Sequence, residues 1–226
     1  MIINLTPDKK EILEKYMEGI LEWNEKVNLT NITEPEEFRV KHIMDSLMCT
    51  GFPEYIRAES IIDVGTGGGF PGIPLAVFSP EKSFTLLDSL NKRLKIIGAL
   101  SEELGISNIR LLHGRAEDMG RAKDHREKYD LCVSRAVSNL ATLSEYCLPF
   151  IKTGGFLLAY KGPGASKEVE EAKGAIRKLG GEFLEIRDIQ LEEYGLDHKI
   201  VVIRKDRPTP KAYPRKAGTP LKEPLK

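Results

Sequence analysis

A cluster of glycines near residue 70 constrains this chain more than any other feature of its sequence. In the segment IIDVGTGGGFPGIPLAV, residues 61–77, an aspartate ends an apolar run and five glycines follow within eight residues. Glycine lets main-chain amides approach a ligand closely, and Pro71 sets a φ angle that suits a first helical turn. A glycine-rich turn between a strand and a helix indicates a nucleotide site, because a helix N-terminus offers unpaired N–H groups. The alternative is a plain tight turn.

Apolar runs and helical stretches alternate from residue 60 onward. Five runs are continuously apolar, as in strands buried on both faces: 60–64, 84–88, 109–113, 130–134 and 155–160. Helices are expected to begin near Phe70, Asn91 and Asn139, and another is expected at 166–179. Two last strands, 182–190 and 198–205, are joined by 191–197, too short for a helical crossover, so they should pair antiparallel. The sequence predicts an α/β fold, a doubly wound and mostly parallel sheet with a C-terminal antiparallel strand.

Length and composition favour one main domain. With 226 residues, 41% of them hydrophobic, the chain can bury one full core. We expect a helical extension at 1–58, a core at 59–205 and a basic, proline-rich tail at 206–226 that is extended, free of helix and at least partly mobile. Residues 204–226 hold eight Lys and Arg against two Asp and Glu, although the whole chain is neutral.

Cysteine usage and hydropathy indicate a soluble, cytoplasmic protein. Cys49, Cys132 and Cys147 are scattered and odd in number, which favours neither a disulfide framework nor a thiolate metal site. No run approaches the roughly 18 apolar residues of a membrane span, and the first residues do not resemble a signal peptide. The histidines show no ligand spacing, so no metal is expected. We expect a monomer.

Two helix starts precede the first strand. Thr6 followed by Pro7 predicts an N-cap and a first helical residue, with apolar residues then recurring at helical spacing. Thr33 and Glu36 match a capping box. On the helix that this box opens, three polar residues lie opposite the apolar face: His42, Asp45 and Ser46.

Two nucleotide classes fit the glycine loop. Gly67, Gly69 and Gly72 satisfy the dinucleotide pattern G-x-G-x-x-G. Asp88 follows this pattern at the sequence separation expected of the acid that holds a ribose. Asp63 instead favours an adenosine ligand with a cationic methionyl group, because its charge would oppose phosphates. Glu117 follows the third strand and could reach an adenine amino group. The alternatives are that Asp88 only caps the helix at Asn91 and that Glu117 is a solvated acid at a helix start.

Several segments together resemble one protein family. They are DVGTGGGFPGIPLA, LLDSLNKRLK, HGRAED, SRAVSNLATLSEYCLPFIKTGG and LAYKG, with NLTNI and HIMDSL upstream and YPRKAGTPLKEPL downstream. In this order they resemble the small-subunit (16S) ribosomal RNA guanine-N7 methyltransferases, also called the glucose-inhibited division protein B family. The resemblance covers almost the whole chain and implies a Rossmann-like class I methyltransferase that uses S-adenosylmethionine. One departure is Gly68, where we would expect alanine.

The resemblance also implies roles for particular residues. Gly65 and Phe70 would border S-adenosylmethionine, and the glycine loop with Gly67 and Gly69 would complete that wall. The remaining cofactor residues would be Asp88, Ser89 and Leu90 at the ribose, Ala116 and Glu117 at the adenine, and Arg135 at the methionyl end. Methyl transfer is an in-line displacement in which proximity supplies most of the rate, and guanine N7 carries no proton, so no general base is needed.

Arg135 is the candidate catalytic residue. It would either anchor the cofactor's carboxylate or reach guanine O6 alone, since N7 must stay free to attack; the alternative is a surface arginine at a strand end. For contacts with 16S ribosomal RNA, in the small subunit or its precursor, we expect Asn28, His42, Asp45 and Lys161. The alternative for the polar helix face is solvation. The basic tail is a further RNA candidate, or only a solvated terminus.

Two other function classes are weighed against methyl transfer. An NAD(P)-dependent oxidoreductase would need a proton-relay pair beside the nicotinamide, and the sequence offers no clear one. An RNA-binding module without catalysis would have no use for the intact glycine loop and its two acids.

Overall fold

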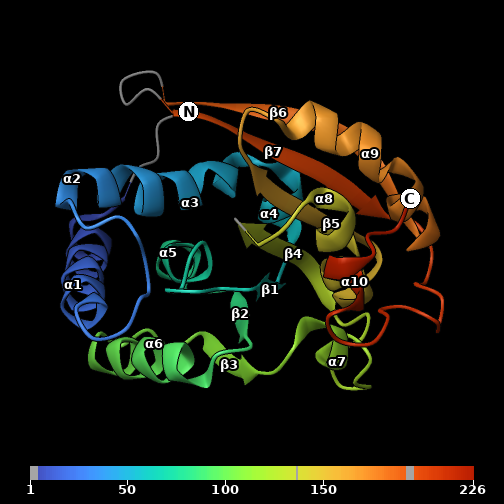
Figure 1. Cartoon of the computed structure of the whole chain (residues 1–226). Helices are drawn as coiled ribbons and strands as arrows, with labels where there is room; N and C mark the ends of the chain where they lie inside the picture. Colours follow the sequence, from blue (N-terminus) through green and yellow to red (C-terminus); the bar gives the residue numbers. More distant parts are fainter. Residues whose placement is uncertain (1–4, 136, 192–195) are drawn as a thin grey trace.

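The computed structural model describes residues 5–135, 137–191 and 196–226, and within them one seven-stranded sheet lies between two layers of helices (Figure 1). The strand order is β3-β2-β1-β4-β5-β7-β6. The strands are β1 Ser60–Val64, β2 Ser83–Asp88, β3 Ile109–His113, β4 Tyr129–Arg135, β5 Ile151–Lys161, β6 Gly181–Leu191 and β7 Leu196–Lys205. The first five pair in parallel, as predicted.

The antiparallel strand is the last one in the chain. β7 pairs antiparallel with both β5 and β6, so it lies between them and β6 forms the edge of the sheet. The predicted antiparallel pairing of the last two strands is therefore confirmed. Most of the short connection that led to it falls outside the described residues, at 192–195.

Helices cover both faces of the sheet. They are α1 Pro7–Asn24, α2 Pro35–Phe38, α3 Asp45–Leu47, α4 Pro53–Arg57, α5 Gly72–Phe78, α6 Asn91–Glu103, α7 Ala116–Met119, α8 Leu140–Cys147, α9 Ala165–Lys178 and α10 Thr219–Lys222. One core packs α1, α3, α5 and α6 on one face, and a second packs α8 and α9 on the other. In β1, Ile61 belongs to the first core and Ile62 to the second, because successive side chains of a strand point to opposite faces. No helix in these described ranges is long and apolar enough to cross a membrane.

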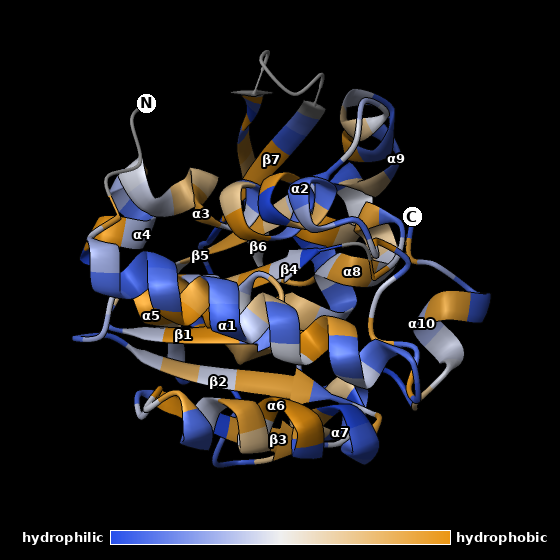
Figure 2. Cartoon of the chain, turned by 90° about the vertical axis from the view of Figure 1, so that its left-hand side faces the viewer, coloured by the Kyte–Doolittle hydropathy of each residue, from blue (hydrophilic) through white to orange (hydrophobic). Residues whose placement is uncertain are grey.

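The first helix begins where its sequence predicts. The Thr6 side chain accepts a hydrogen bond from the Lys9 amide, and Pro7 is the first helical residue. The apolar face of α1 packs on α5 and α6, so it contributes to the core on this face of the sheet. Figure 2 views the molecule from this side, where α1 crosses in front of α5.

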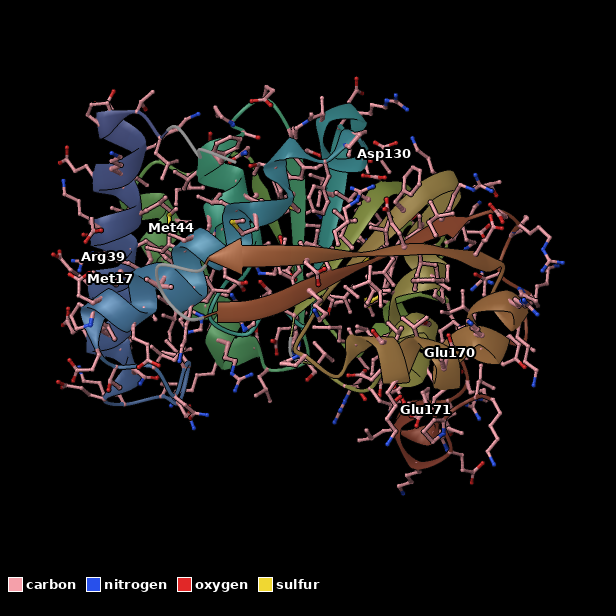
Figure 3. All side chains as sticks on the ribbon, turned by 90° about the horizontal axis from the view of Figure 1, so that it is seen from above. Met17, Arg39, Met44, Asp130, Glu170 and Glu171 are labelled. Carbon is pink, nitrogen blue, oxygen red and sulfur yellow. The ribbon has the colours of Figure 1, made fainter. Side chains whose placement is uncertain are left out.

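The capping box at Thr33 and Glu36 is wrong. The N-cap of α2 is Glu34, whose side chain makes no cap hydrogen bond, and Glu36 pairs instead with Arg39 at 2.5 Å. Arg39 also donates through Nε and Nη2 to Glu14 of α1, so it fastens α2 to α1 (Figure 3). A π-helical stretch, Arg39–Met44, follows and changes which residues share a face. The helical pattern predicted through this region is therefore broken.

The carboxyl ends of the parallel strands lie together at one edge of the sheet. At the opposite ends of the strands Asp130, labelled in Figure 3, is the second residue of β4 and accepts hydrogen bonds from the amides of Glu59 (3.2 Å) and Ser60 (2.9 Å). This carboxylate joins the starts of β1 and β4. The loops that form the site lie at the carboxyl ends of the parallel strands.

The tail, residues 206–226, is not the extended, helix-free segment that its five prolines predict. Arg126 donates to the carbonyls of Thr209 (2.6 Å) and Tyr213 (2.9 Å), so a core side chain satisfies the tail's main chain. The tail also contains α10, which packs against α8 (Figure 1). Its Pro220 lies in the first turn, where the missing N–H costs nothing.

Candidate active site

A cavity of about 510 Å³ opens at the carboxyl ends of β1, β2 and β4. Open parallel sheets bind their ligands at this edge. Most residues expected for the cofactor line it: Gly65, Gly67, Phe70, Asp88, Ser89, Ala116, Glu117 and Arg135. Gly69 and Leu90, which we also expected there, are not part of the lining.

The glycine loop has a shape that side chains would block. Gly65 and Gly69 have φ angles of 75° and 92°, in the left-handed region that favours glycine. A Cβ at Gly69 would lie 2.4 Å from the buried Tyr16 hydroxyl. Gly69 is therefore packed against α1, which is why it shapes the loop instead of lining the cavity. Gly68 has no left-handed φ, so the alanine expected there would fit its backbone.

Nearly all amides of this loop are already hydrogen-bonded within the protein. Six are used in this way: those of Gly65, Thr66, Gly67, Gly69, Phe70 and Gly72. Between residues 65 and 72, which the structure describes throughout, only the amide of Gly68 has no such partner. A diphosphate is bound by several free amides at a helix N-terminus. The loop offers no such cradle, which argues against a dinucleotide site.

Asp63 does not face the cavity, so the expectation that its charge attracts a methionyl group directly is wrong. It is fully buried, and its Oδ2 accepts hydrogen bonds from the Thr66 hydroxyl (2.7 Å) and the Gly72 amide (2.9 Å). Burial raises its pKa to about 6 despite these hydrogen bonds. Asp63 therefore ties the loop to the first turn of α5.

Asp88 lines the cavity and accepts hydrogen bonds from two main-chain amides. Its Oδ2 accepts from the Gly67 amide at 2.9 Å and its Oδ1 from the Leu90 amide at 2.8 Å. The N-cap of α6 is Leu90, without a side-chain cap, so Asp88 is more than a helix cap. Each carboxylate oxygen keeps a second lone pair for a ligand hydroxyl. Leu90 contributes its amide to this arrangement, while its side chain is half exposed.

Glu117 is buried, and the solvated alternative is wrong. Glu117 lies in the first turn of α7 and lines the cavity, and only 4% of its surface is exposed. Its Oε1 accepts a hydrogen bond from the amide of Gly218 in the tail at 2.8 Å. Gly218 and Leu221 also line the cavity, a contribution of the tail that we did not expect.

Arg135 is the centre of a buried polar cluster. Its Nη1 donates to the Lys41 carbonyl and to Asp45 Oδ2, both at 2.8 Å, and its Nη2 donates to His42 Nδ1 at 2.7 Å. Nδ1 of His198 lies 2.7 Å from the other oxygen of Asp45. The surface-arginine alternative is wrong, because the Arg135 side chain is only 13% exposed and its guanidinium is ion-paired with Asp45.

Asp45 supports Arg135 and has no exposed surface of its own. Its expected position on an RNA-facing helix surface is therefore wrong, and Ser46 beside it is equally buried. Burial alone would raise the pKa of Asp45, but the hydrogen bond from His198 and the charge of Arg135 hold it below its ordinary value. The π-helical stretch before Asp45 turns this side chain toward β4.

His42 lies between the Phe70 ring and the Arg135 guanidinium. Its ring stacks on Phe70 with centroids 4.5 Å apart, and its Nε2 lies 2.6 Å from the Thr30 hydroxyl. Burial and the charge of Arg135 lower its pKa to about 3, so the ring is neutral. Because Arg135 occupies Nδ1, the proton is assigned to Nε2, which donates to Thr30.

A second cavity of about 590 Å³ adjoins the first. The two share four lining residues: His42, Arg135, Val137 and Ser138. Tyr160, Lys161 and His198 lie in its remaining wall. Within the described ranges, no group of three or more His, Cys, Asp or Glu could hold a metal ion.

Two expected RNA contacts are placed differently from the prediction. Nζ of Lys161 donates to the Ser138 carbonyl (2.5 Å) and to Glu168 (2.7 Å), and its side chain is only 8% exposed. This charge is paired, so Lys161 braces the wall of the second cavity. Asn28 is exposed but lines neither cavity.

Sequence reasoning missed His198, Gly218 and Leu221. His198 is 153 residues from its partner Asp45, a separation that carries no spacing signal. The tail offered a signal in its Gly-Thr-Pro segment at 218–220, which is compatible with a helix start. Nothing in the sequence aims that helix at the cavity.

Comparisons with known proteins agree with this geometry. The family model described as "rRNA small subunit methyltransferase G" matches residues 9–196. A protein of Alkaliphilus metalliredigens named ribosomal RNA small subunit methyltransferase G is 50% identical over 93% of this chain and 88% of its own length. One of the same name from Clostridium tetani is 48% identical over 99% and 94%.

A solved structure supports the fold. An O-methyltransferase from Bacillus cereus, in complex with S-adenosylhomocysteine, superimposes with a TM-score of 0.58 at 17% identity, covering 84% of this chain and 90% of that one. The extent of the family match and the identity over nearly the full length lead to one conclusion: this chain belongs to the rRNA small subunit methyltransferase G family.

Proposed function

We propose that this chain transfers a methyl group from S-adenosylmethionine to N7 of a guanosine in 16S ribosomal RNA. The first cavity would hold the cofactor and the second the guanine base. The observation that carries this division is the wall that the cavities share, in which Arg135 and His42 contact both spaces. An in-line displacement needs the methyl donor and the acceptor close together, and adjoining cavities would supply that closeness.

The first cavity suits an adenosine ligand without phosphates. Asp88 keeps lone pairs for ribose hydroxyls, and Ala116 and Glu117 lie at the wall expected for the adenine. The loop leaves only one amide free of partners between Gly65 and Gly72, which would leave a diphosphate unsolvated. When bound, S-adenosylmethionine would supply a methyl group on a positively charged sulfur.

The histidine that the two cavities share suits an acceptor that has no proton to lose. His42 is neutral, and both of its ring nitrogens are engaged, Nδ1 by Arg135 and Nε2 by Thr30. It is therefore a poor general base, and an amine or hydroxyl acceptor would need one. Guanine N7 presents a lone pair directly. In this proposal His42, which lines both cavities, positions the base instead of removing a proton from it.

Arg135 retains donors for a ligand. Three of its five N–H groups bind Lys41, Asp45 and His42, which leaves Nε and one hydrogen of Nη2 without a described partner. These donors would reach either the cofactor's carboxylate or guanine O6. Kinetics of Arg135→Ala separate the two: loss of carboxylate binding raises KM for the cofactor, whereas loss of the O6 contact leaves it unchanged and lowers kcat.

The partner and location follow from the proposed substrate. We infer a cytoplasmic enzyme that acts as a monomer on the RNA of the small subunit or its precursor. Asn28, on the exposed surface beside the cavity-lining Leu29, remains a candidate RNA contact. Methylation of naked RNA compared with purified small subunits would distinguish the two forms of substrate.

Nucleoside analysis tests the function directly. Ribosomal RNA lacking the modification is incubated with the protein and methyl-labelled S-adenosylmethionine, digested and separated. Label should appear in 7-methylguanosine and be absent when Arg135→Ala replaces the wild type. Label in another nucleoside would refute the N7 assignment, and no label on any ribosomal substrate would refute the activity.

A further inference from the structure

The basic tail is fixed to the core by a buried ion pair. Glu145 of α8 has no exposed surface, and it accepts hydrogen bonds from Nε (3.0 Å), Nη2 (2.7 Å) and the amide (2.7 Å) of Arg215. Breaking a buried pair leaves an uncompensated charge, so this contact is costly to open. It holds the tail firmly at residue 215.

The residues that follow this anchor reach the first cavity. Gly218 has a φ of 83°, and its amide donates to Glu117 Oε1 at 2.8 Å. The Thr142 hydroxyl, on α8, donates to the Pro220 carbonyl at 3.0 Å and fixes α10. The stretch between Arg215 and Leu221 is therefore held at both ends and in the middle.

Leu221 is an apolar side chain in an exposed position. It is 61% exposed, yet it lines the cavity together with Gly218 and Glu117. An exposed leucine has no packing role in the protein alone. It would become buried if a flat apolar ring occupied the Glu117 end of the cavity.

We propose that residues 218–221, the tail wall, form the outer side of the adenine site, so that the C-terminal tail determines cofactor affinity. This inference rests on the proposed function, because it takes the first cavity to be the cofactor site. Glu117 connects the two: its Oε1 holds Gly218, while its Oε2, with no partner among the described residues, faces an adenine amino group. Leu221 covers the ring, and Arg215 is a positioning residue that acts through Gly218.

The charges of the tail are separable from this wall. Lys211, Lys216 and Lys222 are exposed, and their side chains have no hydrogen bond or ion pair within the described part of the chain. These lysines could contact RNA phosphates without touching the cofactor cavity. An RNA-binding arm and a cofactor wall therefore make opposite predictions for two sets of substitutions.

The test compares Leu221→Ala with the triple variant Lys211→Ala, Lys216→Ala, Lys222→Ala by calorimetry with S-adenosylhomocysteine. Leu221→Ala should raise Kd about fivefold to tenfold without changing the melting temperature of the free protein, since this side chain is exposed there. The triple variant should bind S-adenosylhomocysteine as the wild type does. Arg215→Ala should raise Kd more than tenfold.

A second readout does not depend on the Arg215 variant, which could lose binding simply by misfolding. S-adenosylhomocysteine should slow tryptic cleavage at Lys216 and Lys222 in the wild type, and this protection should be weaker in Leu221→Ala. Wild-type Kd in Leu221→Ala, or a raised Kd in the lysine variant alone, would overturn the tail wall. Absence of binding to the wild-type chain would instead refute the proposed function.

Discussion

Three consecutive glycines, Gly67, Gly68 and Gly69, look equivalent in the sequence but should respond very differently to alanine. Gly67 has a φ of 60°, and the nearest neighbour of an added Cβ would be the Gly65 carbonyl oxygen at 4.0 Å, an ordinary contact. Gly68 has no left-handed φ, and its nearest neighbour would be the Phe70 ring at 3.3 Å. Gly69 has a φ of 92°, and its Cβ would meet the Tyr16 hydroxyl at 2.4 Å and Ile73 at 2.8 Å.

These geometries convert into an order of stability losses. Gly68→Ala should stay within about 0.5 kcal/mol of the wild type, because its φ suits alanine and its tightest new contact, 3.3 Å, is only slightly short. Gly67→Ala should lower the free energy of unfolding by about 1–2 kcal/mol, the cost of a left-handed backbone for a residue with a Cβ. Gly69→Ala pays that penalty and overpacks two buried neighbours, which adds about 1–3 kcal/mol and brings the total to about 2–5 kcal/mol.

Urea unfolding of the three variants measures these differences in the free energy of unfolding. Calorimetry with S-adenosylhomocysteine should find near wild-type affinity for Gly68→Ala. If Gly68→Ala is as destabilised as Gly67→Ala, or Gly69→Ala is no worse than either, the conformational reasoning about this loop is refuted.

Three further substitutions test the clusters around the cavities. Asp45→Asn should lower the free energy of unfolding by about 3–5 kcal/mol in urea titrations, because it leaves the buried guanidinium of Arg135 without its carboxylate; a loss below 1 kcal/mol would contradict this. The hydrogen bond with Asp45 raises the pKa of His198 in the folded protein above its ordinary value of 6.5. The charged His198 therefore stabilises the fold fully below pH 6.5, and this stabilisation is lost as the pH rises through the pKa of the folded state. The stability gap between wild type and His198→Gln should thus shrink from pH 6 to pH 9; a constant gap would argue against a charged His198. Lys161→Met should leave the slope of RNA affinity against salt concentration unchanged, because Glu168 already pairs that charge, and a shallower slope would restore Lys161 as a phosphate contact.

Much of the fold could be predicted from local pattern. The strands are short apolar runs that both cores bury, and the Thr6 cap and the helix at 165–178 are set by neighbours in the sequence. The π-helical stretch at 39–44 could not be predicted, because its residue spacing is also that of an α-helix. What distinguishes it is a tertiary contact, the ion pair of Asp45 with Arg135.

The candidate site was predicted to the extent that its residues follow strands. Asp88 and Arg135 end β2 and β4, Glu117 follows β3 closely, and parallel topology brings such positions together. The tail was misjudged because proline content speaks only of local helix and strand formation. Its position is set by distant side chains, above all the buried Glu145 that pairs with Arg215.

Calorimetric titration of the wild-type chain with S-adenosylhomocysteine and, separately, with NADH is the most direct test of the central claim about the glycine loop. S-adenosylhomocysteine should bind, because it needs no phosphate cradle. NADH should give no measurable heat of binding, because six of the loop's amides are already bonded within the protein and cannot hold its diphosphate. Tight binding of NADH with no binding of S-adenosylhomocysteine would contradict the account.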